Sequence, residues 1–399
     1  MSNRPHIGIF GRRNVGKSAI INALTGQQIA IVSDVSGTTT DPVKKIIELF
    51  GIGPVVLIDT AGIDDKGVLG ALRIEKSKQI IEQIDVAILV IADNIFGDYE
   101  KELLSLFQQL STPFIIVHNK SDKQKINTEI SQQIKQRYNV DALDYTAIPA
   151  SDNDAIISLL KEKIAATAWQ KTSLLNGLIK SGDVVLLITP IDSEAPEGRL
   201  ILPQVQTIRD ILDNHCVAIV LKETEVENFL ATTKIKPALA ITDSQLFGKI
   251  DKLISPEIPL TGFSILLARH KGDFENYLKG TPTISRLQNG DRVLILESCT
   301  HQSSCDDIGR VKIPKWLQEF TEKKLKFEIV SGLSPLPRAA SDYALVIQCG
   351  ACMITQKQLQ NRIKTFTEAG IPVTNYGMAI AYMKGIYNRA IEIFLLSSH

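Results

Sequence analysis

The sequence predicts an α/β fold of three domains, a P-loop doubly wound sheet followed by two smaller α/β domains. At 399 residues the chain is long for a single domain. Apolar runs of strand length alternate with amphipathic helical patterns over residues 6–165, which is typical of a parallel sheet covered by helices on both faces. A glycine-bounded loop, Gly11 to Ser18, follows the first apolar run, and the alternation resumes without such a loop after Asp183.

The bulk composition describes an ordinary globular protein. Apolar residues make up 44% of the chain and charged residues 22%, which is enough apolar material to bury cores of normal size. Lys and Arg together number 44, as do Asp and Glu, so the net charge gives no reason to expect nucleic acid or a membrane as partner. Since neither a membrane-length apolar run nor a signal-peptide pattern is found, we expect a cytoplasmic protein.

The loop Gly11 to Ser18 reads Gly-Arg-Arg-Asn-Val-Gly-Lys-Ser and lies between an expected strand, His6 to Phe10, and an expected helix, Ala19 to Leu24. In that context backbone N–H groups cradle a phosphate and the helix adds its positive end. Lys17 would reach the outer phosphates, and the Ser18 hydroxyl would ligate Mg²⁺. The expected phosphate contacts are Asn14, Val15, Gly16, Lys17, Ser18 and Ala19.

Two further stretches complete the expected phosphate and Mg²⁺ site. Asp59-Thr60-Ala61-Gly62 ends a buried strand, where Asp59 would hold Mg²⁺ through water and the Gly62 N–H would meet the γ-phosphate. The segment Ser36 to Asp41 precedes this strand and is a plausible switch, whose Thr39 we expect to ligate Mg²⁺. The expected catalytic residues are therefore Lys17, Thr39 and Gly62.

The stretch Asn119-Lys120-Ser121-Asp122 follows another buried strand and predicts specificity for guanine. The Asp122 carboxylate can accept two hydrogen bonds from the N1 and N2 edge of guanine, a donor pair that adenine lacks. Asn119 and Lys120 belong to the same expected base site, and the backbone near Ala150 and Ser151 is a weaker candidate for guanine contact. The sequence therefore predicts GTP or GDP, with Mg²⁺, as ligands.

The first 165 or so residues resemble the Era/EngA/TrmE class of GTPases in three motifs, Asn-Val-Gly-Lys-Ser, Gly-Thr-Thr-x-Asp and Asp-Thr-Ala-Gly-Ile. Ile63 stands where Ras-like proteins carry their water-orienting glutamine, so the resemblance implies slow hydrolysis. Asn14 matches an asparagine that, in relatives, helps to place a K⁺ ion in the role of an arginine finger. The resemblance thus implies a slow, Mg²⁺-dependent GTPase that K⁺ stimulates.

The rest of the chain is expected to form two smaller α/β domains. From Asp183 the βαβ pattern returns without a phosphate loop, so we expect an assembly module that forms a homodimer through exposed sheet edges. In the third domain we expect, among other elements, a helix over Arg269–Lys279 and strands over Arg292–Leu296 and Tyr343–Gln348. The expected bounds of the three domains are 1–172, 183–262 and 263–399.

Four of the five cysteines fall in the third domain, whereas Cys216 lies in an apolar strand and is expected to be a core thiol. One predicted strand leads to Cys299-Thr300-His301, and another leads to Cys349-Gly350-Ala351-Cys352. If these strands are parallel in one sheet, both motifs reach the same carboxyl edge and three thiols converge. Thr355 with Gln358 predicts a capping box for the next helix, whose positive end would stabilise a thiolate.

Three kinds of site are compatible with these cysteines. A zinc site could use Cys299, His301, Cys349 and Cys352. A redox dithiol is suggested by the succession of a strand, Cys-Gly-Ala-Cys and a helix. An iron–sulfur cluster uses cysteine thiolates and accepts an odd fourth ligand. The residues by themselves leave all three open.

Over its whole length the chain resembles the HydF family, the GTPases that mature FeFe-hydrogenase. The resemblance rests on Cys-x-His, a long gap and Cys-x-x-Cys, together with the stretch Cys305–Pro314. It implies an iron–sulfur domain in which Cys299, Cys349 and Cys352 hold a 4Fe–4S cluster. The fourth ligand stays open among Cys305, His301, water and an exogenous ligand, because Gln348 stands where many members have His.

The same resemblance implies the function of a metallochaperone. Such a GTPase scaffold assembles the precursor of the hydrogenase di-iron subcluster with radical-SAM partner maturases and delivers it to the FeFe-hydrogenase apoprotein. The alternative is a translation- or RNA-associated GTPase with a zinc- or dithiol-containing C-terminal domain, since many Era/EngA relatives bind RNA. Against that alternative, residues 183–399 carry no stripe of Lys and Arg interleaved with aromatic residues.

Overall fold

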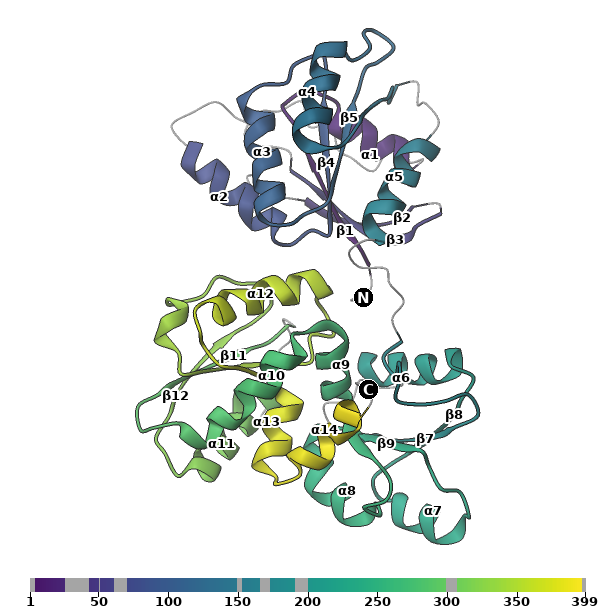
Figure 1. The fold of residues 1–399 in the computed structure, drawn as a ribbon, viewed down its shortest axis with the longest axis vertical. Coiled ribbons are helices and arrows are strands. Elements are labelled where there is room, and N and C mark those ends of the chain that lie inside the picture. The colour runs from purple at the N-terminus through teal and green to yellow at the C-terminus, as the bar shows by residue number, and fades with distance from the viewer. Residues whose placement is uncertain are drawn as a thin grey trace. The chain divides into compact units, whose positions relative to one another are not determined.

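The structure is a computed structural model that describes residues 4–25, 43–49, 51–60, 70–148, 153–165, 173–190, 200–298 and 307–396. The chain forms two compact units, residues 3–170 and residues 171–399. In Figure 1 the N-terminal unit runs from purple to blue and the C-terminal unit from teal to yellow. Each unit is described by itself.

The N-terminal unit contains a six-stranded sheet in the order β2-β3-β1-β4-β5-β6. All neighbouring strands are parallel except β2, which pairs antiparallel with β3. The strands are β1 (His6–Phe10), β2 (Val43–Leu49), β3 (Gly53–Asp59), β4 (Val86–Ile91), β5 (Phe114–His118) and β6 (Ala142–Asp144). The helices are α1 (Lys17–Thr25), α2 (Gly70–Ile81), α3 (Asp98–Gln109), α4 (Thr128–Tyr138) and α5 (Asp154–Ala165).

Apolar residues fill both faces of this sheet. Every residue of β4 is buried, as expected for a central parallel strand covered on two sides. Its side chains alternate between two cores, with Ile88 in the core under α1 and α5 and Leu89 in the core under α2, α3 and α4. The N-terminal unit is therefore the doubly wound α/β domain that the alternating pattern predicts, and ligand-binding loops are expected at the carboxyl ends of its strands.

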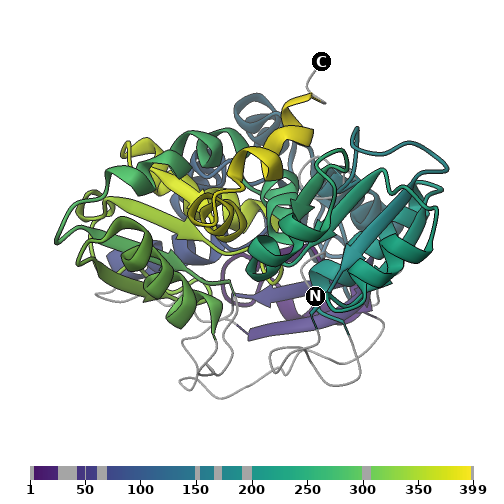
Figure 2. The same cartoon turned by 90° about the horizontal axis from the view of Figure 1, so that it is seen from below.

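The C-terminal unit contains two four-stranded sheets, and all described pairings in both are parallel. The first has the order β10-β9-β7-β8 and the second the order β12-β11-β13-β14. In Figure 2 the first sheet is coloured from teal to green and the second from green to yellow. The strands of the first are β7 (Val184–Ile188), β8 (Val217–Leu221), β9 (Leu239–Thr242) and β10 (Leu260–Gly262). Those of the second are β11 (Arg292–Leu296), β12 (Lys326–Val330), β13 (Leu345–Gln348) and β14 (Val373–Asn375).

Helices connect and cover these sheets. The α-helices are α6 (Leu202–Asp213), α7 (Val226–Thr232), α8 (Phe247–Leu253), α9 (Phe263–Lys271), α10 (Phe274–Gly280), α11 (Ile313–Thr321), α12 (Gln356–Glu368), α13 (Tyr376–Met383) and α14 (Tyr387–Leu396). Short 3₁₀ segments are η1 (Ser244–Leu246), η2 (Thr281–Arg286) and η4 (Ala340–Asp342), and η3 (Ile308–Lys312) is a π-helical turn. None of the helices in the described ranges is long and apolar enough to cross a membrane.

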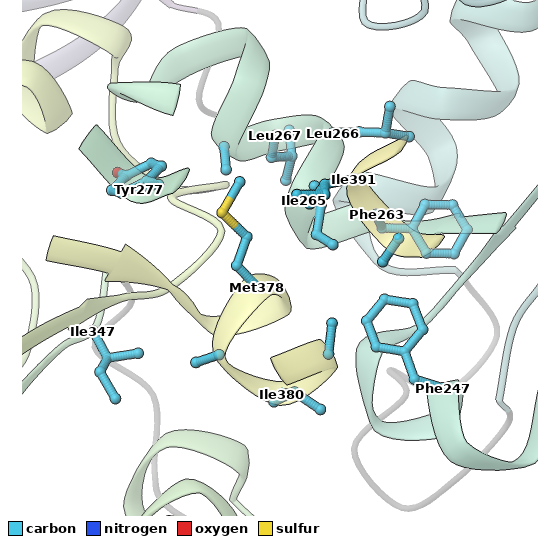
Figure 3. Close-up of a cluster of buried hydrophobic side chains, with 14 of the residues drawn as sticks. Phe247, Phe263, Ile265, Leu266, Leu267, Tyr277, Ile347, Met378, Ile380 and Ile391 are labelled. Carbon is cyan, nitrogen blue, oxygen red and sulfur yellow. The ribbon is translucent and has the colours of Figure 1, made fainter. Parts of the chain in front are cut away.

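One hydrophobic core joins the two sheets of the C-terminal unit. Phe263 and Leu267 of α9 lie in the same cluster as Met378 of α13 and Phe247 of α8 (Figure 3). The end of α10 also packs directly on backbone, because a Cβ at Gly280 would overlap the Val373 carbonyl oxygen. Since α9 contributes to this shared core, the two sheets are expected to stabilise one another.

The predicted fold class is confirmed, and β11 and β13 are parallel neighbours, which is the condition for the two cysteine motifs to reach the same edge. The single helix predicted over Arg269–Lys279 is wrong, because α9 ends at Lys271 and α10 begins at Phe274. Gly272 interrupts the helix in an extended conformation, and the Asp273 side chain accepts a hydrogen bond from Asn276 N, which starts a new helix. The apolar periodicity continues across this break, so it gives no sign of it.

Candidate functional site

The phosphate loop joins β1 to α1 at the carboxyl edge of the N-terminal sheet. Asn14 has a φ of 64° and Gly16 a φ of 92°, so the loop turns through left-handed conformations on its way into the helix. A Cβ at Gly16 would overlap Asn119 Nδ2, so a glycine is needed here for space as well as for φ. Val15 is buried while Asn14 is exposed, which fixes the loop on one side and leaves its tip in solvent.

Lys17 is buried at the start of α1 and its ammonium folds over the loop. Its Nζ donates to the carbonyl oxygens of Gly11 at 2.6 Å and Arg12 at 2.9 Å. Two donors of the ammonium group are thus used to hold the side chain along the loop, where a bound phosphate would lie. Ser18 and Ala19 follow in the first turn of α1, which begins at Lys17, two residues before the expected start at Ala19.

Arg12 is a loop residue that sequence reasoning missed. Its guanidinium donates to both carboxylate oxygens of Glu100, from Nε at 2.7 Å and from Nη2 at 2.9 Å. Glu100 lies in the first turn of α3 and also accepts from the Gly97 N–H at 2.8 Å. The hydrogen bond with Glu100 raises the pKa of Arg12. This bidentate pair fixes the loop to α3, and the distance of 88 residues along the chain explains why no local pattern reveals it.

Asn119 connects the expected base site to the phosphate loop. Its Nδ2 donates to the Val15 carbonyl oxygen at 2.9 Å, and its Oδ1 accepts from the Ala147 N–H at 3.2 Å. Both hydrogen bonds are buried. The asparagine therefore holds together three segments that are distant in sequence and fixes their spacing.

The rest of this motif forms a turn braced by Thr146. The Asp122 N–H donates to Thr146 Oγ1 at 3.1 Å, and the Ser121 hydroxyl lies 3.0 Å from the same oxygen. Lys120 has a φ of 61°, and its Nζ contacts the Asp93 carboxylate at 3.3 Å. The Asp122 side chain is exposed at this turn. A carboxylate must be accessible in this way to accept hydrogen bonds from a ligand.

Asp59 ends β3 beside the phosphate loop, since Asp59 pairs in register with Ile9 of β1. The next residue, Thr60, donates from its hydroxyl to the Ile9 carbonyl oxygen at 2.6 Å. The structure thus brings Asp59 to the same carboxyl edge as Lys17 and Ser18. Thr39, Gly62, Ala150 and Ser151, which were also predicted, lie outside the described residues.

In the C-terminal unit, Cys349 and Cys352 lie in a loop between β13 and α12, which we call the cysteine loop (residues 349–355). Parallel pairing places Leu296 opposite Gln348, so the ends of β11 and β13 coincide. The Cys349 sulfur accepts the Ser298 N–H at 3.2 Å. The segment after β11 and the cysteine loop therefore meet at one edge, as the sequence predicts.

The surroundings of Cys349 are rich in hydrogen-bond donors. Besides Ser298, its sulfur is contacted by Gln348 Nε2 at 3.4 Å and by the Ala351 N–H at 3.5 Å. Ala351 has a φ of 53°, unusual for a residue with a side chain, and this turns its N–H back toward the sulfur. Burial raises the pKa of the Cys349 thiol, while the hydrogen bond with Ser298 acts in the opposite direction. These donors suit a sulfur that carries negative charge.

The helix that follows the cysteine loop begins as predicted. Thr355 Oγ1 accepts from the Gln358 N–H at 3.3 Å, and Gln358 Oε1 accepts from the Thr355 N–H at 3.0 Å. This capping box starts α12 beside the cysteines, so its positive end faces them. Cys216, in contrast, is buried next to β8 and its thiol donates to the Lys180 carbonyl oxygen, which confirms a core thiol.

The remaining predicted cluster ligands, Cys299, His301 and Cys305, lie outside the described residues. Within the ranges that the structure describes, no three His, Cys, Asp or Glu side chains are gathered to hold a metal ion. The described chain supplies two of the predicted thiol ligands, Cys349 and Cys352.

The fold and the loop geometry agree with comparison to known families. Residues 6–120 match the family described as 50S ribosome-binding GTPase, so the N-terminal unit is a GTPase domain, a class that binds GTP or GDP with Mg²⁺. Residues 174–272 match the hydrogen maturase F dimerization domain, and residues 275–393 match the hydrogen maturase F tetramerization domain. The chain belongs to the hydrogen maturase F (HydF) family.

Two curated relatives match part of the chain. GTPase Der of Wolinella succinogenes is 33% identical over 163 residues, which are 40% of this chain and 34% of that protein. The tRNA modification GTPase MnmE of Heliobacterium modesticaldum is 40% identical over 117 residues, 29% of this chain and 24% of that protein. The chain thus spans about a third or less of these two relatives. The solved structure of Era from Aquifex aeolicus is 20% identical and covers 55% of this chain and 93% of its own, with a TM-score of 0.35.

We expect Asn119→Ala to weaken GTP binding by about 2 kcal/mol, roughly thirtyfold, because the change removes two buried hydrogen bonds that space the base site from the phosphate loop. Calorimetric titration with GTP measures this. Asn94→Ala is the matched control, since Asn94 also bonds two backbone groups of the same unit, but through hydrogen bonds that are exposed. Equal losses in the two variants would contradict a specific function of Asn119.

Proposed function

We propose that this protein is a GTPase scaffold that carries a 4Fe–4S cluster and assembles or delivers the di-iron subcluster precursor of FeFe-hydrogenase. The observation that carries the proposal is the cysteine loop. Its first sulfur is surrounded by N–H donors, at the sheet edge to which the Cys299 segment leads, in a chain of the hydrogen maturase F family. Its partners would be the hydrogenase apoprotein and radical-SAM maturases.

The GTPase domain would bind GTP with the residues at its carboxyl sheet edge. Lys17 would neutralise the outer phosphates, Ser18 and Asp59 would hold Mg²⁺ directly and through water, and Asp122 would accept from guanine. Thr39 and the Gly62 N–H complete the proposed set. Hydrolysis would be slow, and GTP would set the contacts with partners.

Potassium is the proposed accelerator of this hydrolysis. We expect faster turnover in KCl than in NaCl, and we expect Asn14→Ala to abolish the difference, because the exposed Asn14 side chain at the loop tip would help to place the ion. Steady-state phosphate release in both salts measures it. Asn139→Ala is the control, since Asn139 is another exposed asparagine at a φ of 55° and carries the same backbone strain when changed. Equal wild-type rates in the two salts would exclude this use of K⁺.

The donor set around the cysteine loop fits an iron–sulfur cluster. Cys349, Cys352 and Cys299 would be its thiolate ligands, and Ser298 and Ala351 would donate hydrogen bonds to the Cys349 sulfur. Bound by three thiolates, the cluster would offer one iron with an exchangeable ligand, to which an incoming metal complex could attach. Gln348 cannot supply an imidazole, and its amide is instead a donor to Ser298 Oγ and to Cys349.

We expect Cys349→Ala to remove most of the iron from anaerobically purified protein, because it deletes a thiolate ligand and the acceptor of the Ser298 hydrogen bond. Cys216→Ala should keep its iron, since that thiol is buried next to β8 in the other sheet. Iron and sulfide analysis measures both. Cys305→Ala and His301→Ala should retain the cluster and alter only its electron paramagnetic resonance spectrum. Loss of iron in Cys305→Ala equal to that in Cys349→Ala would mean a closed four-cysteine site and would contradict the open-site carrier.

The proposed dimer contact is the outer edge of β8. This strand ends the sheet, so one row of its backbone N–H and C=O groups is not paired by a described strand. Val217 and Val220 on it are 51% and 40% exposed, and Val205 and Leu212 of the neighbouring α6 are also exposed. An apolar sheet edge inside the segment that matches a dimerization domain suits pairing with a second copy.

We expect Val220→Glu to halve the mass of the assembly, because two copies would bring charges into an apolar strand pairing. Light scattering of the full chain at several concentrations measures it. Deletion of 183–262 is unsuitable as a test, since that segment contributes to the shared core. Ile95→Glu is the control, because Ile95 is 50% exposed in the N-terminal unit. An unchanged mass for Val220→Glu would place the contact elsewhere.

A further inference from the structure

A buried lysine at the end of α9 reaches into the cysteine loop. Lys271 is only 4% exposed. Its Nζ donates to the carbonyl oxygens of Ala351 and Ile354, both at 3.4 Å, and these two residues bracket Cys352 in sequence. Lys271 belongs to the segment that matches the dimerization domain, whereas the loop belongs to the next matched segment. One side chain therefore joins the two segments at the proposed cluster site.

Among the described residues, no carboxylate forms an ion pair with the Lys271 ammonium. Burial lowers its pKa to about 8, and negative charge at Cys352 and Cys349 acts in the opposite direction. Arg362 of α12 is a second cation near Cys349; it is half-buried, and burial lowers its pKa too. The nearby Glu297 carboxylate is bound by Arg310 at 2.9 Å and by the Ser331 hydroxyl at 2.8 Å.

Tyr277 is the third titratable side chain near the cysteines. It is neutral and does not balance the positive charge of Lys271. Its hydroxyl is buried without a hydrogen-bond partner among the described residues, and burial first, then negative charge at Cys349 and Asp273, raises its pKa well above the ordinary value. Negative charge at Cys352 and Cys349 would stabilise the charged form of Lys271, whereas Arg362 is also stabilised by negative charge at Glu297. A buried ammonium without a counter-charge is costly, so its position favours an anionic occupant of the loop.

Arg362 and Lys271 donate hydrogen bonds to different segments. Arg362 donates to the carbonyl oxygens of Glu297 at 2.8 Å and Val330 at 2.9 Å, so it ties together the ends of β11 and β12. Lys271 bonds only to the cysteine loop in the contacts described above. A cation next to an iron–sulfur cluster stabilises the state with one more electron, because that state is more negative.

We propose that Lys271 is a positioning residue for the cluster: it holds the cysteine loop against α9, and its positive charge makes the cluster easier to reduce. The inference rests on the proposed function, because it requires a cluster on Cys349 and Cys352. The inference goes beyond that function, because the dimerization segment would supply a charged group to the cluster site, which lies in the tetramerization segment.

The test compares wild type with Lys271→Gln and Lys271→Met in full-length, iron-loaded protein. Dithionite supplies one electron per cluster, and electron paramagnetic resonance at a series of potentials gives the midpoint. We expect both variants to shift the reduction equilibrium at least tenfold toward the oxidised cluster, which is about 59 mV for a one-electron couple. Glutamine and methionine both remove the charge, whereas Lys271→Arg keeps it together with N–H donors, so a shift in the first two variants that is absent in the arginine variant reports the charge.

Lys279→Met is the matched control, because it removes the same charge from α10 at a side chain that is 75% exposed. It should leave the midpoint unchanged. Lys271→Arg, which keeps the charge, should remain near wild type even if Lys271→Met fails to fold. A wild-type midpoint in Lys271→Gln would overturn the inference while the proposed function stands. A wild-type protein that binds no iron would overturn the proposed function and the inference together, so iron content is measured first.

Discussion

The parallel pairing of β11 with β13 is the constraint on which the C-terminal site depends. The register sets Leu296 opposite Gln348, and the Cys349 N–H then donates to the Leu296 carbonyl oxygen at 2.9 Å. Only in this register does the Ser298 N–H reach the Cys349 sulfur. A shift by one residue would turn every side chain of β13 to the opposite face and force the buried side chains on both faces to repack. Because both strands are completely buried from their second residue onward, the apolar core makes such a shift costly.

The phosphate loop and the cysteine loop both lie at the carboxyl ends of parallel strands, but the contacts that fix them come from different parts of the chain. At the nucleotide site, Asn119, Lys17 and the Arg12–Glu100 pair all belong to one unit, so the GTPase domain positions its own loop. The cysteine loop is held in part by Lys271 of α9, and α9 packs into the core shared by both C-terminal sheets. A mutation in the dimerization segment can therefore disturb the cysteine loop, and activity loss from such a mutation is not evidence that dimerization itself is required.

The sequence was most informative where local signals agree with the fold. The bounds of β11, α11 and α12 follow from apolar runs and from the Thr355–Gln358 capping box, and the motif order places Asn119 and Cys349 after strands. The antiparallel edge strand β2, the short β10 and the break at Gly272 were not predicted, since pairing partners and backbone contacts decide them. The functional contacts of Arg12 and Lys271 span about 80 residues or more, which no window of sequence can relate.

The distribution of charge around the cysteine loop could not be predicted from the composition of the chain. The chain has equal numbers of basic and acidic residues, so its net charge is zero. This value is an average over the whole chain and says nothing about a particular site. In the folded protein Glu297 is paired with Arg310, while Lys271 is buried and Arg362 half-buried near thiols. Burying a cation disfavours folding unless a negative group arrives to balance it. The cysteine loop, with its converging N–H donors and positive helix end, is where that negative group is expected, so the proposed anionic cluster would offset the free-energy cost of burying these charges.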